Sequence, residues 1–206
     1  MTTTNPEALT YDDDALEAGW DSPIRAQNLV ESFVVTGSLV LDVGIGTGLA
    51  VKGYQEKGAS VIGVDHDPTM IEAAHAATGV MDIRLGDVNS NLPIEDLKRS
   101  VDVIQAIGVL EFAYNLKDTI AELATCLKDD GVIVFTVEVP QDGSETKRTE
   151  YFPDHDITVF RHSPEEVRVV LKGLGFNLLH SEVYGGYTRG DETAQYAIFL
   201  AQRSNG

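Results

Sequence analysis

The sequence is short of several residue types, and each shortage narrows what the protein can be. Its 206 residues include one cysteine, Cys126, so an internal disulfide and a metal cluster with several cysteine ligands are excluded. No pair of histidines, including His155 and His162, has the spacing of metal ligands. No apolar run approaches the roughly 20 residues that cross a bilayer, and Met1–Thr10 lacks the basic-then-apolar pattern of a signal peptide. We therefore expect a cytoplasmic protein without a membrane-spanning segment or a bound metal.

Basic residues are also scarce. The 15 Lys and Arg residues stand against 33 Asp and Glu residues, which gives a formal net charge of −18. A field of that sign repels phosphate backbones and anionic lipids, so we expect neither a nucleic-acid partner nor a membrane partner. We interpret the acidity as a source of solubility, consistent with a salty cytoplasm, and an attraction for cationic substrates is the alternative.

The order of apolar and helical segments predicts the fold class. The length suits one α/β domain, and 43% hydrophobic residues are enough to form its core. Apolar runs of strand length alternate with helical stretches, which is the pattern of βαβ units. We expect a single doubly wound, mostly parallel seven-stranded sheet with helices on both faces and an antiparallel C-terminal hairpin. The expected strands are 39–42, 60–64, 82–85, 101–106, 132–137, 177–184 and 194–201.

Capping residues place the expected helices between these strands. Ser22-Pro23, Asp67-Pro68 and Ser163-Pro164 each put a capping side chain before a proline at the first helical position. The expected helices are 24–33, 49–57, 69–77, 116–127 and 165–174. The fourth carries Cys126 as a buried thiol and is expected to stop at the turn 129–131.

Two segments stand outside the alternation. Residues 1–36 are expected to form an N-terminal helical cap on a Rossmann-like domain of residues 37–206. The polar stretch 141–156 is too long for an ordinary connection, so we expect a lid within 141–162, and a merely mobile loop is the alternative.

A glycine-rich turn follows the first expected strand. Residues 39–48 read LVLDVGIGTG, and glycines allow a sharp bend and a close approach of the backbone to a ligand. The free N–H groups at the start of the following helix favour a carboxylate or a phosphate. A dinucleotide fingerprint requires its third glycine at position 49, where Leu49 stands. Asp42 at the strand end is unfavourable beside a pyrophosphate but suits a ligand that carries an ammonium group.

Residues 40–50 resemble motif I of the class I, Rossmann-like methyltransferases. Residues 63–70, 85–88 and 101–112 resemble that family's next three motifs, in the same order. The resemblance implies S-adenosylmethionine as cofactor, whose methionine end carries both an ammonium and a carboxylate, and S-adenosylhomocysteine as product. It implies that the cofactor contacts Asp42, Gly44, Ile45, Gly46, Thr47, Gly48, Asp65, His66, Met70, Gly86, Asp87, Val88, Ala106, Ile107 and Gly108.

The resemblance also suggests roles within this set. Asp65 would accept hydrogen bonds from both ribose hydroxyls, which suits an ionised carboxylate. Asp87 would accept one from the adenine amino group, while His66 and Met70 would border the adenine. For Asp42, Asp65 and Asp87 the structural alternative is a cap or turn acid. All three follow parallel strands, however, at the edge where such sheets bind ligands.

The acceptor side is less clearly marked. Many relatives have a histidine where this chain has Glu111-Phe112, so a histidine base is not expected. Glu111 is the candidate catalytic residue, either as a base or as a group that orients the substrate. The candidate substrate contacts are Tyr11, Trp20, Glu111, Phe112 and Tyr151. Aromatic faces attract a methylsulfonium, and ordinary packing is the alternative for each aromatic residue.

Methyl transfer from a sulfonium is an in-line displacement that mainly requires alignment, so no catalytic triad is needed. We expect transfer to an O, N or C nucleophile of a small molecule. A protein that binds S-adenosylmethionine without catalysis and a methyltransferase acting on a protein are the alternatives. A nucleotide-dependent dehydrogenase is disfavoured by Leu49.

Overall fold

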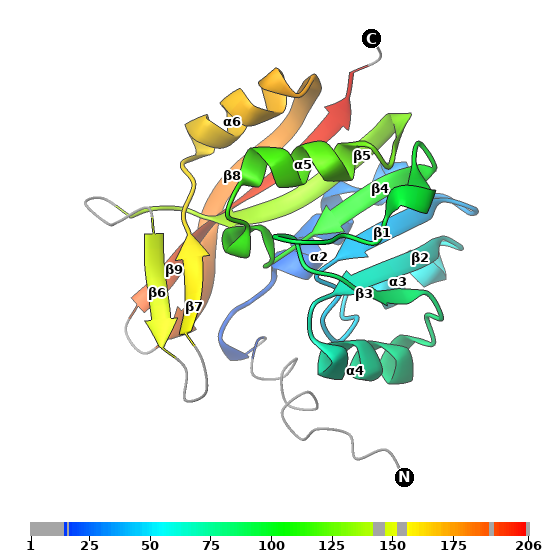
Figure 1. Ribbon diagram of the computed structural model, residues 1–206, viewed down its shortest axis with the longest axis horizontal. Helices are drawn as coiled ribbons and strands as arrows, with labels where there is room; N and C mark the ends of the chain where they lie inside the picture. Colours follow the sequence, from blue (N-terminus) through cyan, green and yellow to red (C-terminus); the bar gives the residue numbers. More distant parts are fainter. Residues whose placement is uncertain (1–14, 16, 142–146, 152–155, 190–191, 205–206) are drawn as a thin grey trace.

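Strands and helices alternate along the part of the chain that the computed structural model describes, residues 15, 17–141, 147–151, 156–189 and 192–204. The helices are α2 (Ser22–Leu29), α3 (Val51–Glu56), α4 (Pro68–Thr78), α5 (Leu116–Ala124) and α6 (Pro164–Gly173), with short 3₁₀ turns η1 (Glu31–Phe33), η2 (Glu95–Leu97) and η3 (Leu110–Phe112). The strands are β1 (Leu39–Val43), β2 (Ser60–Asp65), β3 (Ile83–Leu85), β4 (Val101–Ala106), β5 (Leu127–Glu138), β6 (Lys147–Tyr151), β7 (Asp156–Phe160), β8 (Phe176–Arg189) and β9 (Glu192–Arg203) (Figure 1).

The main sheet has seven strands in the order β3-β2-β1-β4-β5-β9-β8. The pairs from β3 to β5 are parallel, whereas β9 pairs antiparallel with both β5 and β8. The predicted fold class is therefore confirmed, including the antiparallel hairpin at the C-terminal end. The parallel strands β1, β2 and β4 are apolar over most of their length because helices cover both faces of the sheet there.

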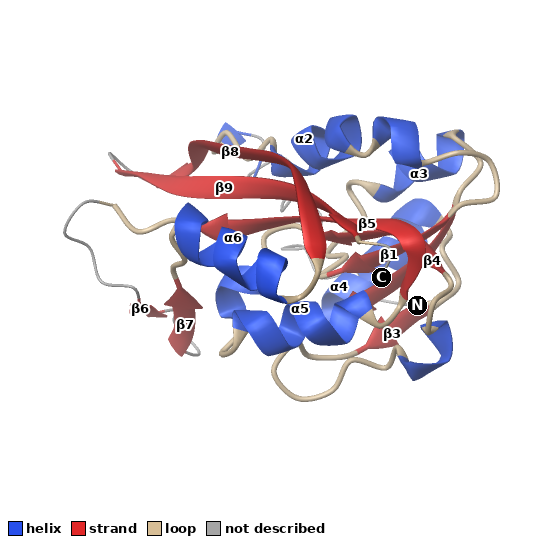
Figure 2. Cartoon of the chain, turned by 90° about the horizontal axis from the view of Figure 1, so that it is seen from above, coloured by secondary structure: helices blue, strands red, loops and turns tan. Residues whose placement is uncertain are grey.

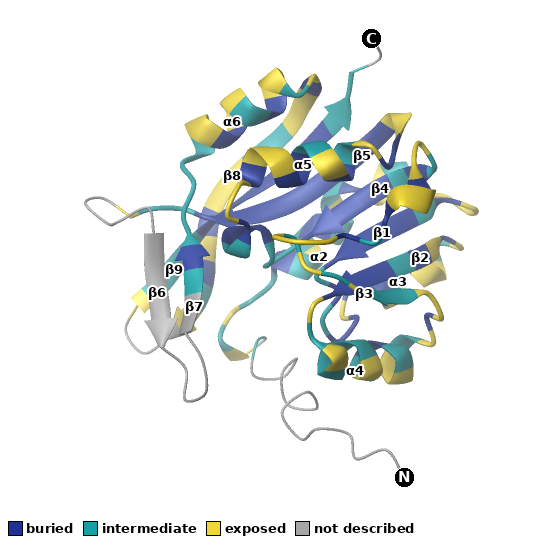
Figure 3. Ribbon diagram, viewed as in Figure 1, coloured by how far each residue is buried: buried dark blue, intermediate teal, exposed yellow. Residues whose placement is uncertain are grey.

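Two apolar clusters lie on opposite faces of the sheet. On one face, Ile120 of α5 and Leu171 of α6 pack with Ile104 and Phe135. On the other face, Ala26 of α2, together with buried residues of α3 and α4, packs with Val103. Figure 2 shows α2 and α3 on one side of the sheet and α5 and α6 on the other. In Figure 3 the sheet is largely buried, and the outer surfaces of the helices are exposed.

The strand order places a topological switch point between β1 and β4. The chain runs outward from β1 through β2 to β3, and then returns to begin β4 on the other side of β1. The loops after β1 and β4 therefore lead away in opposite directions at the carboxyl edge of the sheet. Open α/β sheets bind ligands at this edge.

The fourth expected helix ends sooner than its sequence pattern predicts. α5 stops at Ala124, and residues 129–131 lie inside β5 rather than in a turn. Asp129 and Asp130 are exposed near the start of β5. The pairing of this part of β5 with β4 is irregular, because the register shifts between Val101 and Val103. The irregular pairing and the solvated position accommodate acids and a glycine in a strand. Cys126 is fully buried beyond the helix end, so the expected buried thiol is confirmed, but not its helical setting.

Other boundaries also differ from expectation. α3 begins at Val51 rather than at residue 49, because the glycine loop continues as turns through Ala50. The expected helix 24–33 is divided into α2 and η1. Part of the stretch 141–156 forms β6, which pairs antiparallel with β7. Among the described residues, no helix combines the length and hydropathy needed to span a bilayer.

Candidate active site

The loop between β1 and α3 has the bent backbone that its glycines predict. Gly44, Gly46 and Gly48 have φ angles of +73°, +56° and +87°, a region that favours glycine. A Cβ added at Gly44 would lie 2.8 Å from Cβ of Val109, so the loops after β1 and β4 touch there. A Cβ added at Gly46 would meet nothing within 4 Å. The loop is thus packed at Gly44 and open at Gly46, while Ile45 and Thr47 are buried.

Asp65 joins this loop to the end of β2. Its Oδ2 accepts from the backbone N–H of Gly46 at 2.8 Å, and its Oδ1 accepts from that of Asp67 at 3.0 Å. Burial opposes ionisation, but hydrogen bonds from His66, Asp67 and Gly46 outweigh it and hold the pKa of Asp65 below its usual value. The structure therefore brings the first two predicted motifs together around an ionised carboxylate.

His66 and Met70 lie beside this contact. The His66 side chain is exposed, with Nδ1 at 3.4 Å from Oδ1 of Asp65, and this hydrogen bond raises the pKa of His66. Met70 is half-buried in the first turn of α4. The predicted cap is present, because the Asp67 side chain accepts from the backbone N–H of Thr69 at 2.8 Å. Both candidate adenine neighbours therefore lie at the carboxyl edge of the sheet.

Asp42 is buried near the end of β1, with 3% of its surface exposed. The amide Nε2 of Gln105, on β4, donates to its Oδ1 at 3.1 Å. Burial raises the pKa of Asp42 to about 7, the Gln105 hydrogen bond lowers it, and the charge of Asp65 raises it. Asp42 and Asp65 are therefore close enough for their charges to interact, as a shared site requires.

The third predicted segment begins at the end of β3. The backbone N–H of Gly86 donates to the carbonyl of Asp65 at 2.9 Å, which connects this segment to β2. Asp87 is exposed, and its Oδ1 accepts from the backbone N–H of Asn89 at 2.8 Å. Val88 is half-buried against the core. Asp87 thus has the turn-stabilising role considered as an alternative, and it is also placed at the expected edge.

The loop after β4 completes this edge. Ala106 is buried at the strand end, and Ile107 packs at the edge of the core that faces α2 and α3. The backbone N–H of Gly108 donates to Oγ1 of Thr136, on β5, at 2.9 Å. Trp20 packs over this loop, because a Cβ added at Gly108 would lie 3.0 Å from Cζ2 of Trp20. Trp20 is thus the described aromatic residue that covers the predicted cofactor segment.

Glu111 lies in η3 and is buried, with 3% of its surface exposed. The hydroxyl of Tyr196, on β9, donates to its Oε1 at 3.1 Å. Burial and the charge of Glu111 raise the pKa of Tyr196 well above its usual value, so the phenol stays protonated as the donor. Phe112 is half-buried beside Glu111. The candidate catalytic carboxylate is therefore held by a side chain from the C-terminal hairpin.

Three aromatic rings gather near Glu111. Trp20 packs edge-on against Tyr196 at 4.9 Å and against Tyr187 at 6.2 Å between ring centroids. Tyr11 lies outside the described residues. Tyr151 belongs to β6, but its side chain lies outside the description. Of the aromatic substrate candidates, the structure therefore places Trp20 against Gly108 and Phe112 in η3, half-buried.

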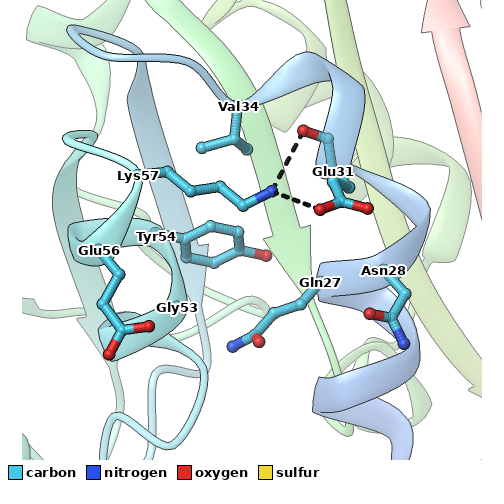
Figure 4. A pocket seen from close by; sticks show the side chains of 8 residues that line it. All are labelled: Gln27, Asn28, Glu31, Val34, Gly53, Tyr54, Glu56 and Lys57. Atoms are coloured by element: carbon cyan, nitrogen blue, oxygen red, sulfur yellow. Dashed lines mark hydrogen bonds and ion pairs between the residues drawn. The ribbon is translucent and has the colours of Figure 1, made fainter.

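A separate cavity of about 240 Å³ lies between α2 and α3. It is lined by Gln27, Asn28, Glu31, Val34, Gly53, Tyr54, Glu56 and Lys57 (Figure 4). None of these residues belongs to the predicted site. Figure 4 shows the phenol of Tyr54 pointing away from α3 into the space between the two helices. Its hydroxyl donates a hydrogen bond to Oε1 of Gln105.

Gln105 and Tyr196 take part in the site but were not predicted from the sequence. Gln105 is a polar residue in the otherwise apolar end of β4, VIQA. A polar side chain in a buried strand indicates a specific hydrogen-bonding partner, and this pattern could have identified Gln105. Tyr196 lies in the sequence AQYAIF of β9 and reaches Glu111 only through the pairing of distant strands. No local pattern marks such a partner.

Comparison with known proteins agrees with this geometry. Residues 41–135 match the protein family described as methyltransferase domain. Nearly half of the chain is therefore similar to a methyltransferase domain. The matched segment runs from within β1 to within β5, and it includes the glycine loop, Asp42, Asp65 and Glu111.

Curated relatives match the methyltransferase domain over part of their length. The ubiquinone biosynthesis O-methyltransferase of Pseudomonas entomophila is 24% identical over 117 residues, which are 56% of this chain and 50% of that protein. The demethylmenaquinone methyltransferase of Tropheryma whipplei is 32% identical over 102 residues, 49% of this chain and 42% of that protein. The matches thus span about half the length of these relatives or less.

A solved structure confirms the fold more broadly. An S-adenosylmethionine-dependent methyltransferase from Methanosarcina mazei superposes with a TM-score of 0.72 at 17% sequence identity. The superposition covers 86% of this chain and 98% of that chain. The shared architecture therefore extends beyond the matched segment 41–135.

Proposed function

We propose that this protein is an S-adenosylmethionine-dependent methyltransferase that acts on an O, N or C nucleophile of a small molecule. The observation that carries the proposal is the contact between the N–H of Gly46 and the carboxylate of Asp65, 2.8 Å long, at the switch point of the sheet. This contact joins a bent, open backbone to an ionised acid at the edge where such sheets bind ligands.

The residues at this edge fit the proposed cofactor. The depressed pKa of Asp65 keeps a carboxylate ready to accept hydrogen bonds from vicinal hydroxyls. The open space beside Gly46 admits a ligand close to the backbone. Asp42 supplies an acid for the ammonium group, and Asp87 supplies one for the adenine amino group. When bound, the cofactor supplies a methyl group already activated by its sulfonium.

The chain's remaining task is to place the acceptor. We assign Glu111 to that task, because a buried carboxylate can orient a polar acceptor or take its proton. Trp20 covers the adjoining loop. Strand β7 lies beside η3, and the ring of Phe160 at its end lies 5.7 Å from that of Tyr114, two residues beyond η3. This position supports the proposal of a lid within residues 141–162. The quinone-pathway names of the two curated relatives support a small-molecule acceptor.

Calorimetry with S-adenosylmethionine and S-adenosylhomocysteine tests the cofactor assignment. We expect both to bind, and Asp65→Ala to weaken both by about tenfold or more, because charge-assisted hydrogen bonds to the ribose are lost. Asp129→Ala is the matched control, since Asp129 is an exposed acid near the start of β5. Binding of NAD without binding of either sulfur ligand would refute the proposal and favour a dehydrogenase.

A protein that binds the cofactor without catalysis is the second candidate. The observation that favours it is the burial of Glu111 beneath Tyr196, with Phe112 in place of a second polar residue. Release of S-adenosylhomocysteine in the presence of phenols, amines and quinols distinguishes the two. Turnover with any of them establishes the enzyme, whereas binding without turnover across the set favours the second candidate.

A further inference from the structure

Three polar side chains form a buried hydrogen-bonded chain beneath the glycine loop. The hydroxyl of Tyr54 donates to Oε1 of Gln105, and Nε2 of Gln105 donates to Oδ1 of Asp42. Tyr54, Gln105 and Asp42 are 2%, 2% and 3% exposed. They come from α3, β4 and β1, so the chain crosses from a helix through the sheet to the strand that precedes the glycine loop.

The direction of this chain is set by its chemistry. An amide oxygen can only accept a hydrogen bond, so the hydroxyl of Tyr54 is the donor, and burial raises the pKa of Tyr54, which keeps the phenol protonated. Because the amide oxygen is engaged by Tyr54, the NH₂ group of Gln105 must face Asp42. Tyr54 therefore fixes the amide orientation that presents a donor to the carboxylate.

Buried polar groups are costly unless they are hydrogen-bonded, so an apolar side chain at position 105 would suit the fold better. Ile104 and Ala106 on either side of Gln105 are apolar and fully buried. The amide of Gln105 instead bonds to the hydroxyl of Tyr54 and to Asp42. Its one charged partner is Asp42, which lies two residues before Gly44.

We propose that Gln105 and Tyr54 are positioning residues that hold the Asp42 carboxylate toward the ammonium group of the bound cofactor. The inference rests on the proposed function and deepens it, because it assigns the support for one end of the cofactor site. Gln105 holds one carboxylate oxygen, and this fixes the rotation of the carboxylate. The ionisable groups that face Asp42 are Asp65 from β2 and Tyr54 from α3. Neither donates to Asp42 directly, and the side chain that does is Gln105.

Two ligands separate positioning from general structural support. S-adenosylhomocysteine carries the ammonium, whereas 5′-methylthioadenosine shares its adenosine and sulfur but lacks the amino-acid end. We expect Gln105→Leu to weaken S-adenosylhomocysteine about tenfold, the loss expected for one hydrogen bond to a charged group. We expect Tyr54→Phe, which removes only the anchoring hydroxyl, to weaken it about threefold. The affinity for 5′-methylthioadenosine should stay within about twofold in both variants.

The matched control is Gln202→Leu. Gln202, on β9, also donates a side-chain hydrogen bond within the sheet. Its acceptor is the carbonyl of Asp130 near the start of β5, at the edge of the sheet opposite the glycine loop. This variant should bind both ligands as the unmodified protein does. Thermal unfolding of every variant, monitored by circular dichroism, checks that each is folded. Tyr54→Phe conserves the ring, so it keeps the test decisive if Gln105→Leu does not fold.

The outcomes are distinguishable. If the unmodified protein binds S-adenosylhomocysteine and the folded variants lose affinity for both ligands equally, the role is structural and the inference is wrong. Unchanged affinity for S-adenosylhomocysteine in the folded variants also overturns it. If the unmodified protein binds neither ligand, the proposed function itself fails. A loss confined to S-adenosylhomocysteine supports the inference.

Discussion

Asp42 shows how a buried carboxyl group of the proposed site can oppose the stability of the fold that carries it. An isolated carboxyl titrates near 3.8, but burial raises the pKa of Asp42 to about 7. The folded protein therefore holds this proton more tightly than the unfolded chain does. By linkage, Asp42 costs no stability below about pH 4, costs progressively more as the pH rises toward 7, and costs most above it.

Asp42→Asn should therefore stabilise the protein at alkaline pH. An asparagine oxygen still accepts from Gln105, and it carries no charge to desolvate. We expect a gain of about 2–4 kcal/mol near pH 8, which shrinks as the pH falls through 7 toward 4. Urea unfolding at several pH values measures this. A variant that is no more stable than the unmodified protein near pH 8 would contradict the assignment of a costly buried carboxylate.

The predicted cofactor residues illustrate which side chains a sequence can reveal. Asp42, Asp65 and the glycines form a pattern because each must occupy a set place along one strand or loop. Gln105 and Tyr54 follow no such pattern, since their roles depend on contact between β1, β4 and α3. Tyr54 and Gln105 are 51 residues apart in the sequence, so no local sequence pattern indicates that they are hydrogen-bonded.

At the scale of elements, the glycine loop is held by the loop after β4. A Cβ at Gly44 would meet Cβ of Val109 at 2.8 Å, and a branched side chain cannot yield easily there. At Gly46 a Cβ would meet nothing within 4 Å. The two glycines share a left-handed backbone but differ in crowding, which makes them a matched pair.

Gly44→Ala should cost more stability than Gly46→Ala. Both substitutions place a Cβ on a left-handed residue, which costs about 1–2 kcal/mol, and Gly44→Ala adds steric overlap of about 1–3 kcal/mol. Chemical denaturation of the two variants measures the difference. Equal losses of stability would show that the loops after β1 and β4 do not press against each other at Gly44.

Element boundaries depended on interactions that a local pattern does not contain. The acids at 129 and 130 read as a helix stop, yet β5 includes them because its first residues pair irregularly and face solvent. Residues 147–151 lack the apolar alternation of a buried strand, and they pair with β7 instead of joining the main sheet. In both places, tertiary pairing determined the structure.

At the scale of the whole molecule, the acidic surface carries a net charge of −18. Like charges on a compact molecule repel one another, and salt screens that repulsion as the Debye length falls from about 10 Å at 0.1 M to about 3 Å at 1 M. Raising potassium chloride over this range should raise the melting temperature by several degrees. Sodium chloride at equal molarity should act alike, because screening depends on ionic strength. A flat or falling melting temperature would contradict this account.

The order of strands and helices, the bend after the first strand and the position of Asp42 and Asp65 at strand ends could be predicted, because each depends on residues adjacent along the chain. Apolar runs specify buried strands, and glycine specifies a backbone that other residues avoid. Pairing between distant segments was decided only when the sheet assembled. Assembly put Tyr196 against Glu111, Trp20 over Gly108 and Gln105 beside Asp42, since such contacts depend on strand register and packing rather than on neighbours in sequence.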